Sequence, residues 1–200
     1  VEPGGEQLLE LRLQRQQPLV ALEQRQQLGA QVRQEALSDL MQIKAAAVDY
    51  IGQETDRRGF IPGQGWAHSA AHSADLLDEL AQCQELKLPD CLDLLAATGQ
   101  LATNPYNGYA HNEDDRLSIA DLSIFRRSLL SLNAWKQWLE DLSQSPGLSQ
   151  PFPHGYNSRT NLRLFLNSFS FRLRSLPGAN PQRTPVLAEI DAALSKITRL

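Results

Sequence analysis

Apolar residues recur at steps of three and four along most of this chain, and this periodicity constrains the fold more than any other feature. The clearest stretch ends near Gly52 and contains Val32, Ala36, Leu37, Leu40, Ile43, Ala47, Val48 and Ile51. Later stretches repeat the pattern with Leu162, Phe165, Leu166, Phe169, Leu173 and Leu176, and with Val186, Ile190, Leu194 and Ile197. Such steps place one side of an α-helix against a core. No segment alternates apolar and polar residues long enough to predict a strand, so we expect an all-α fold.

The predicted helices follow one another in consecutive pairs joined by short or medium loops. This order favours paired antiparallel helices, arranged as a HEAT- or armadillo-like helical array or as an irregular bundle. One helix is expected from about Trp66 to Cys83. The residues expected to be buried lie on apolar helix stripes: Trp66, Leu77, Leu139, Phe165, Phe169 and Ile190.

Residues 1–35 differ in composition from the rest of the chain, being rich in Gln, Leu and Arg. Pro18 interrupts this part, and proline lacks the N–H that a helix interior needs. We therefore expect two short N-terminal helices or a partly ordered arm, followed by a single helical domain over residues 36–200. Within that domain, the glycines and proline of Asp56–Gly65 predict a shaped loop.

The composition restricts the classes of partner. The chain has 200 residues, of which 42% are hydrophobic, and a formal net charge of −4. The acidic balance argues against a nucleic-acid partner, which needs a basic face. The candidates for such a face are Arg159, Arg163, Arg172 and Arg174. No stretch approaches the roughly 20 apolar residues that a membrane span requires.

Two features bear on the cellular compartment. The sequence starts at Val1 without an initiator Met, so we expect an exported protein whose signal peptide has been removed, and otherwise a cytoplasmic one. Cys83 and Cys91 fit either a disulfide across a helix hairpin or two small buried hydrophobes.

The segment after the glycine-rich loop carries the candidate site. On a helix, four of its polar residues fall within about 60° of one another, namely His68, His72, Asp75 and Glu79, here called the histidine row. Trp66 falls on the opposite side, toward the core. Histidines four apart can share a divalent metal such as zinc, with Asp75 as a further ligand, or the row can transfer protons. Structural histidines satisfied by their neighbours are the alternative.

The loop itself adds Arg57 and Arg58. A glycine-rich lead into a helix can hold an anion, but the phosphate-binding glycine patterns are absent, so an Asp56–arginine pair is the simpler expectation. We expect this loop to form one wall of a cleft lined by the first three residues of the histidine row. The acidic cluster His111–Arg116 is predicted only to cap a helix.

Three blocks of the sequence resemble a bacterial family, domain of unknown function 2785. The first consists of residues 56–60 (DRRGF) and 65–77 (GWAHSAAHSADLL). The second consists of residues 113–117 (EDDRL) and 126–130 (RRSLL), and the third of residues 161–166 (NLRLFL), running on to Phe171. The resemblance covers roughly residues 50–176. It implies a helical, HEAT-like fold and no established activity.

The leading functional hypothesis is a non-enzymatic binding module without a cofactor. Paired helices stacked in an arc would offer a concave surface to a peptide or protein ligand, with the histidine row as a polar floor and Arg57 or Arg58 beside it. The alternative is a metal-dependent or acid–base enzyme that uses His68, His72 and Asp75, with a divalent metal such as zinc.

Overall fold

The computed structural model describes the backbone of residues 5–198 and the side chains of residues 25–198, and this part of the chain is helical apart from one short hairpin. Its α-helices are α1 (Gly5–Gln53), α2 (Ser69–Gln82), α3 (Leu88–Ala102), α4 (Glu113–Arg126), α5 (Leu132–Ser143), α6 (His154–Ser175) and α7 (Arg183–Ile197). Strands β1 (Phe60–Ile61) and β2 (Gly65–Trp66) form the hairpin, and a 3-10 turn, η1, covers Pro146–Ser149. The predicted all-α class is confirmed.

By its internal contacts the chain divides into two units, Val1–Ile43 and Lys44–Leu200. Helix α1 contributes to both, and it runs through Pro18 without ending, so the prediction of two short helices there is wrong. Gln, Leu and Arg fill this part of the chain. They are good helix formers, and they sustain a helix that lacks one backbone hydrogen bond at the proline. The expected domain boundary at residue 35 stays a prediction.

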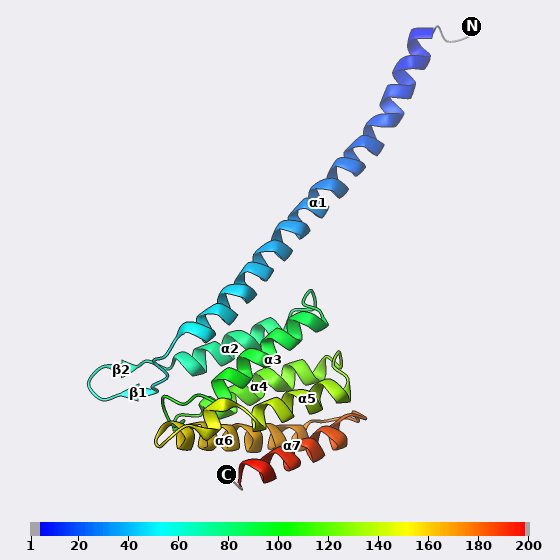
Figure 1. Cartoon of the computed structure of the whole chain (residues 1–200). Helices are drawn as coiled ribbons and strands as arrows, with labels where there is room; N and C mark the ends of the chain where they lie inside the picture. The colour runs from blue at the N-terminus through cyan, green and yellow to red at the C-terminus, as the bar shows by residue number, and fades with distance from the viewer. Residues whose placement is uncertain (1–4, 199–200) are drawn as a thin grey trace. The chain divides into compact units, whose positions relative to one another are not determined.

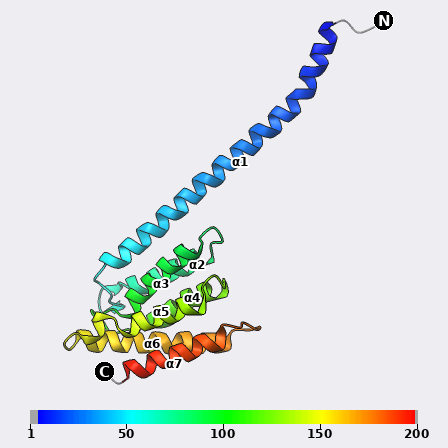
Figure 2. The ribbon, with the colours of Figure 1, turned by 45° about the vertical axis from the view of Figure 1, so that its right-hand side comes forward.

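The helices after the hairpin pack in two layers (Figures 1 and 2). Helices α2, α4 and α6 lie side by side in that order, while α5 packs against α7, and α3 packs against α4 and α5. His68 lies beside Glu113 near the starts of α2 and α4, and Asp78 accepts a hydrogen bond from Ser123 near their ends. These two helices are therefore parallel, and α3 between them returns antiparallel. The predicted packing in helix pairs is confirmed.

Aromatic side chains of α5 and α6 occupy the centre of the core. The ring centroids of Trp135 and Phe169 are 5.9 Å apart, and those of Trp138 and Phe165 are 6.1 Å apart. The apolar stripes predicted from the sequence meet here. Burial is confirmed for Leu77, Leu139, Phe165, Phe169 and Ile190.

Trp66 is the exception, because 59% of its surface is exposed and its predicted burial is wrong. Helix α2 begins at Ser69, so helical spacing does not apply to Trp66. The tryptophan belongs instead to β2, where it pairs with Phe60 of β1. Gly63, in the turn between the strands, has a φ of 78°, a left-handed conformation that glycine adopts without steric cost.

The two cysteines are free thiols in this structure, with Cys91 buried and Cys83 half-buried. Cys91 Sγ lies 3.5 Å from Nη1 of Arg127. No helix among the described residues is long and apolar enough to cross a membrane.

Candidate functional site

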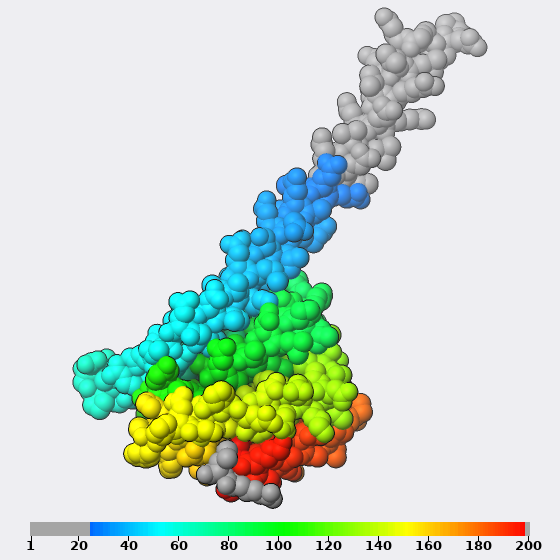
Figure 3. Space-filling view, viewed as in Figure 1, coloured from blue at the N-terminus to red at the C-terminus, as the bar shows by residue number. Residues whose placement is uncertain are grey.

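The β1–β2 hairpin carries two exposed aromatic side chains, and Figure 3 shows it projecting from the helices that follow it. Trp66 and Phe60 are 59% and 47% exposed, and their ring centroids lie 5.2 Å apart in an edge-to-face arrangement. The indole of Trp66 also stacks on the imidazole of His68 at 4.5 Å and meets the ring of His111 at 5.2 Å. Trp66 is therefore held in place although most of its surface is exposed.

His68 occupies the turn into α2. Its backbone is left-handed, with a φ of 49°. Its N–H donates to the carbonyl of Arg58 at 2.9 Å, and its carbonyl accepts from the N–H of His72 at 3.0 Å. The ring is buried, and its Nε2 lies 3.4 Å from Oε1 of Glu113 without a hydrogen-bond partner among the described residues. Because an unpaired buried nitrogen costs free energy, the ring must gain from packing, and its stacking on Trp66 at 4.5 Å is the nearest of its ring contacts.

Glu113 opens α4 and is almost completely buried. Its Oε2 accepts hydrogen bonds from the backbone N–H groups of Ala110 at 3.2 Å and His111 at 2.8 Å, and its Oε1 lies 3.8 Å from Nδ1 of His111. The positive end of the helix dipole favours a carboxylate at this position. Gly59 leaves the space, because a Cβ there would lie 2.2 Å from Nδ1 of His111 and 2.9 Å from Oε1 of Glu113. We call Phe60, Trp66, His68, His111 and Glu113 the hairpin cluster.

The histidine row stays together only in part, because the rings of His68 and His72 still meet edge to face. His72 is exposed, with its ring centroid 6.0 Å from that of His68. Asp75 forms an ion pair with Arg116 of α4 at 2.5 Å, and Glu79 is exposed. The reason is that α2 begins at Ser69, so the left-handed turn directs the ring of His68 toward Trp66 and Glu113 instead of along the helix face.

The residues suggested as metal ligands, His68, His72 and Asp75, are therefore not gathered around one point. Among the residues that the structure describes, no three His, Cys, Asp or Glu side chains are placed to hold a metal ion. Whether any member of the histidine row contacts a ligand stays a prediction.

The two adjacent arginines of the loop point to different partners. Arg57 is buried, and its Nη2 donates to the carbonyl of Ile51 near the end of α1. Arg58 is exposed and donates to the carboxylate of Asp56 from Nε at 2.8 Å and from Nη2 at 2.6 Å. These hydrogen bonds lower the pKa of Asp56 to about 2. The expected Asp56–arginine pair is confirmed, and both arginines fasten the loop that carries the hairpin.

Phe60, Glu113 and His111 are the members of the cluster that the sequence prediction missed: it treated Phe60 as part of a loop and assigned residues 111–116 to a helix cap alone. Glu113 does open a helix, but its side chain turns into the cluster. The available signal was the co-occurrence of two blocks that carry the family resemblance. Residues 56–77 and 113–117 meet at this place in the structure.

Comparison with known proteins adds one finding. The sequence model of a family described as Protein of unknown function (DUF2785) matches residues 12–171. No curated protein and no solved structure matches the chain. The match includes the hairpin cluster and extends upstream of residue 50, at which the sequence resemblance begins, into α1. The chain belongs to the DUF2785 family.

Proposed function

We propose that this protein is a non-enzymatic binding module that takes a peptide or protein ligand at the hairpin cluster. One observation carries the proposal: Trp66 and Phe60 are exposed and pack on each other, and the indole of Trp66 stacks on buried His68, which lies beside buried Glu113. Aromatic anchors dominate the energetics of protein interfaces because they supply a large contact area. An anchor held in place before binding also avoids the entropy cost of ordering it.

The arrangement of the helices supports a ligand larger than a metabolite. Helices α2, α4 and α6 lie side by side with the returning helices in a second layer, and stacked helix pairs of this kind, as in the proposed HEAT-like array, offer an extended surface to a ligand. Beside the hairpin cluster, two ion pairs link these helices, Asp75–Arg116 at 2.5 Å and Asp115–Arg172 at 2.7 Å. The charged groups of these ion pairs can form further hydrogen bonds, which an extended peptide lying across α2, α4 and α6 would use.

One alternative, an acid–base enzyme, is favoured by the His68–Glu113 pair, because an imidazole beside a carboxylate is a common proton-transfer arrangement. The ring of His68 is buried beneath Trp66. A substrate would have to displace the indole to reach it. Replacing Trp66 would therefore increase access to His68 in an enzyme, whereas it would remove the anchor of a binding module.

Peptides selected from a random library displayed on phage, with the full chain as bait, provide defined probes. Trp66→Ala should weaken a selected peptide by about 2 kcal/mol or more, which is about thirtyfold in Kd, and Phe60→Ala should act in the same direction. Phe171→Ala is the matched control, since this α6 residue is 70% exposed and lies outside the hairpin cluster. Because Trp135 and Trp138 are buried, peptide binding should shift the fluorescence of Trp66 to the blue.

Equal losses of affinity in Trp66→Ala and Phe171→Ala would place the ligand elsewhere. So would selected peptides whose Kd is the same for Trp66→Ala and the unmodified chain. Turnover of a substrate that increases in Trp66→Ala would favour the enzyme.

A further inference from the structure

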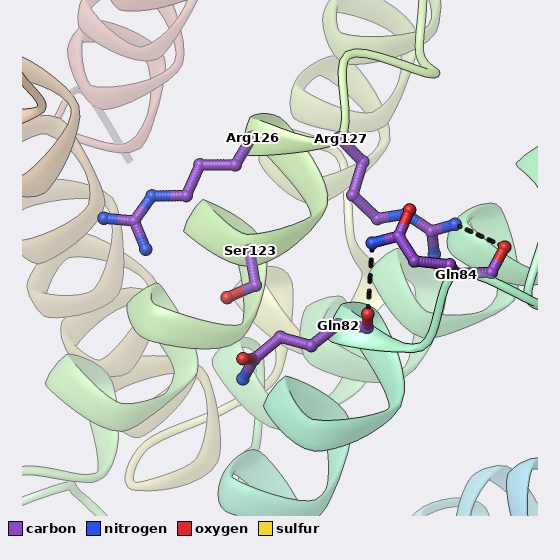
Figure 4. A pocket seen from close by; sticks show the side chains of 5 residues that line it. All are labelled: Gln82, Gln84, Ser123, Arg126 and Arg127. Carbon is purple, nitrogen blue, oxygen red and sulfur yellow. Dashed lines mark hydrogen bonds between the residues drawn. The ribbon is translucent and has the colours of Figure 1, made fainter. Parts of the chain in front are cut away.

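We infer that the cavity where α2 and α4 end binds a small organic anion carrying a carboxylate or a phosphate group. The cavity has a volume of about 440 Å³ and is lined by Gln82, Gln84, Ser123, Arg126 and Arg127 (Figure 4). Ligand pockets usually enclose roughly 300–1,000 Å³. The hairpin cluster lies at the opposite ends of the same two helices, so this site goes beyond the proposed function and does not depend on it.

Arg127 holds one wall of the cavity. Its guanidinium donates to the carbonyl of Leu86 at 2.5 Å and, at longer distances, to those of Ala81 and Gln84. These carbonyls belong to the end of α2 and the loop after it, where a helix carries partial negative charge. The donors of Arg127 are thus used within the protein, and Arg127 is a positioning residue for the loop.

Arg126 is the guanidinium that remains available. Successive residues on a helix point about 100° apart, so Arg126 faces away from the loop that Arg127 holds. It is exposed and has no ion pair or hydrogen bond with the residues that the structure describes. Figure 4 shows its side chain extending away from Arg127, over the side on which Ser123 lies. A guanidinium without a counter-ion presents paired N–H donors that fit a carboxylate or a phosphate.

A carboxylate of the protein approaches this lining but does not neutralise Arg126. Oδ1 of Asp78 accepts from Oγ of Ser123 at 2.5 Å, and its Oδ2 accepts from Nε2 of Gln82 at 3.1 Å. Both oxygens of Asp78 are therefore engaged by neutral donors of the lining. The remaining capacity of Ser123 and Gln82 is as acceptors, through the hydroxyl lone pairs and the amide Oε1. The matching ligand carries hydroxyl or amino donors beside its anionic group.

Binding can be followed on the full chain by NMR titration of backbone amide shifts with two probes, glycerate for the carboxylate class and glycerol 3-phosphate for the phosphate class. At least one probe should shift the amides of residues 82–84 and 123–127. Arg126→Gln should raise its Kd about tenfold or more, because a charge-assisted pair of hydrogen bonds is lost. Arg33→Gln, which removes the same charge from an exposed position on α1, should leave Kd unchanged. The probe that binds identifies the anionic group.

Equal weakening in Arg126→Gln and Arg33→Gln would assign the binding to overall charge and overturn the inference. Shifts confined to other parts of the chain, or no shifts with either probe in the millimolar range, would also overturn it. Arg126→Gln should change the thermal midpoint little, since this exposed side chain makes no hydrogen bond or ion pair with the described residues.

Discussion

Asp121 of α4 is completely buried, and desolvation raises its pKa well above the ordinary value for an aspartate. Oγ1 of Thr98 lies 2.9 Å from Oδ1 of Asp121 and 2.9 Å from the carbonyl oxygen of Leu95. A threonine hydroxyl has one proton and cannot donate to both. When Asp121 is protonated, its own O–H donates to Thr98, and Thr98 donates to Leu95. Oδ2 of Asp121 has no partner among the described residues, a position far more costly for a charged oxygen than for a neutral one.

A raised pKa in the folded state sets the sign of the pH dependence. The unfolded chain loses the proton of Asp121 above about pH 4, whereas the native state keeps it. The stability that Asp121 contributes is therefore fully present below that pH and is lost as the pH rises toward the folded pKa. The slope for one proton is at most about 1.4 kcal/mol per pH unit. Asp121→Asn cannot ionise, and its amide can donate to Thr98 as the protonated acid does, so it should lack this slope.

The assay is urea unfolding of the unmodified chain and of Asp121→Asn at several pH values between about 4 and 8, where carboxylates titrate in the unfolded chain. Groups such as Asp56, whose pKa is lowered, contribute stability that is lost as the pH falls. They are common to both proteins and cancel in the difference. As the pH rises, the free energy of unfolding of Asp121→Asn should increase relative to that of the unmodified chain. Two curves that stay parallel across this range would refute a buried neutral Asp121.

Two further substitutions test the packing of the core and of the candidate site. Phe165→Ala should lower the free energy of unfolding in urea by about 3–5 kcal/mol because the ring is fully buried. The control is Phe171→Ala, which removes an exposed ring from the same helix and should cost less than about 0.5 kcal/mol. Similar losses in the two variants would show that Phe165 is not tightly packed. Gly59→Ala should cost about 1–3 kcal/mol, because its Cβ would lie 2.2 Å from Nδ1 of His111. Gly52→Ala, whose Cβ would meet its nearest atom at 3.9 Å, is the control and should be neutral or stabilising. Equal thermal midpoints for the two glycine variants would mean that His111 moves aside freely.

The helical core could be predicted from the sequence because burial on one side of a helix leaves a periodic trace. Phe165, Phe169 and Ile190 follow that trace, and all three are buried. Trp66 shows where this prediction from periodicity fails. The same spacing placed it on a helix, but the chain forms a hairpin at this point and α2 begins only at Ser69. Periodicity predicts which side of a helix is buried, and it does not determine where the helix begins.

The candidate site could be predicted only in part, for a different physical reason. Trp66 and His68 stand out locally, so both were named. Glu113 and His111 join them through contact between α2 and α4, which are separated in the chain by a whole returning helix. No local spacing specifies which helices become neighbours. The buried role of Glu113 therefore follows from the tertiary packing, and its sequence context indicates a helix cap.

The two helix entries at the hairpin cluster share one backbone feature. His68, before α2, and Asn112, before α4, are both left-handed, with φ values of 49° and 64°. This conformation costs an L-residue about 1–2 kcal/mol, and asparagine is among the residues that tolerate it. His68 gains no side-chain capping hydrogen bond in return. Its compensation is the contact of its ring with Trp66 at 4.5 Å.

The histidine that supports the indole is thus itself packed against it, so that removing either side chain takes away one contact of the other. Strained backbone of this kind concentrates at functional sites. An exposed tryptophan without a fixed orientation on the hairpin would need no such support. The strain at His68 is explained if a ligand binds to a fixed Trp66. The entropy of ordering the Trp66 side chain is then lost during folding and is not lost again on binding.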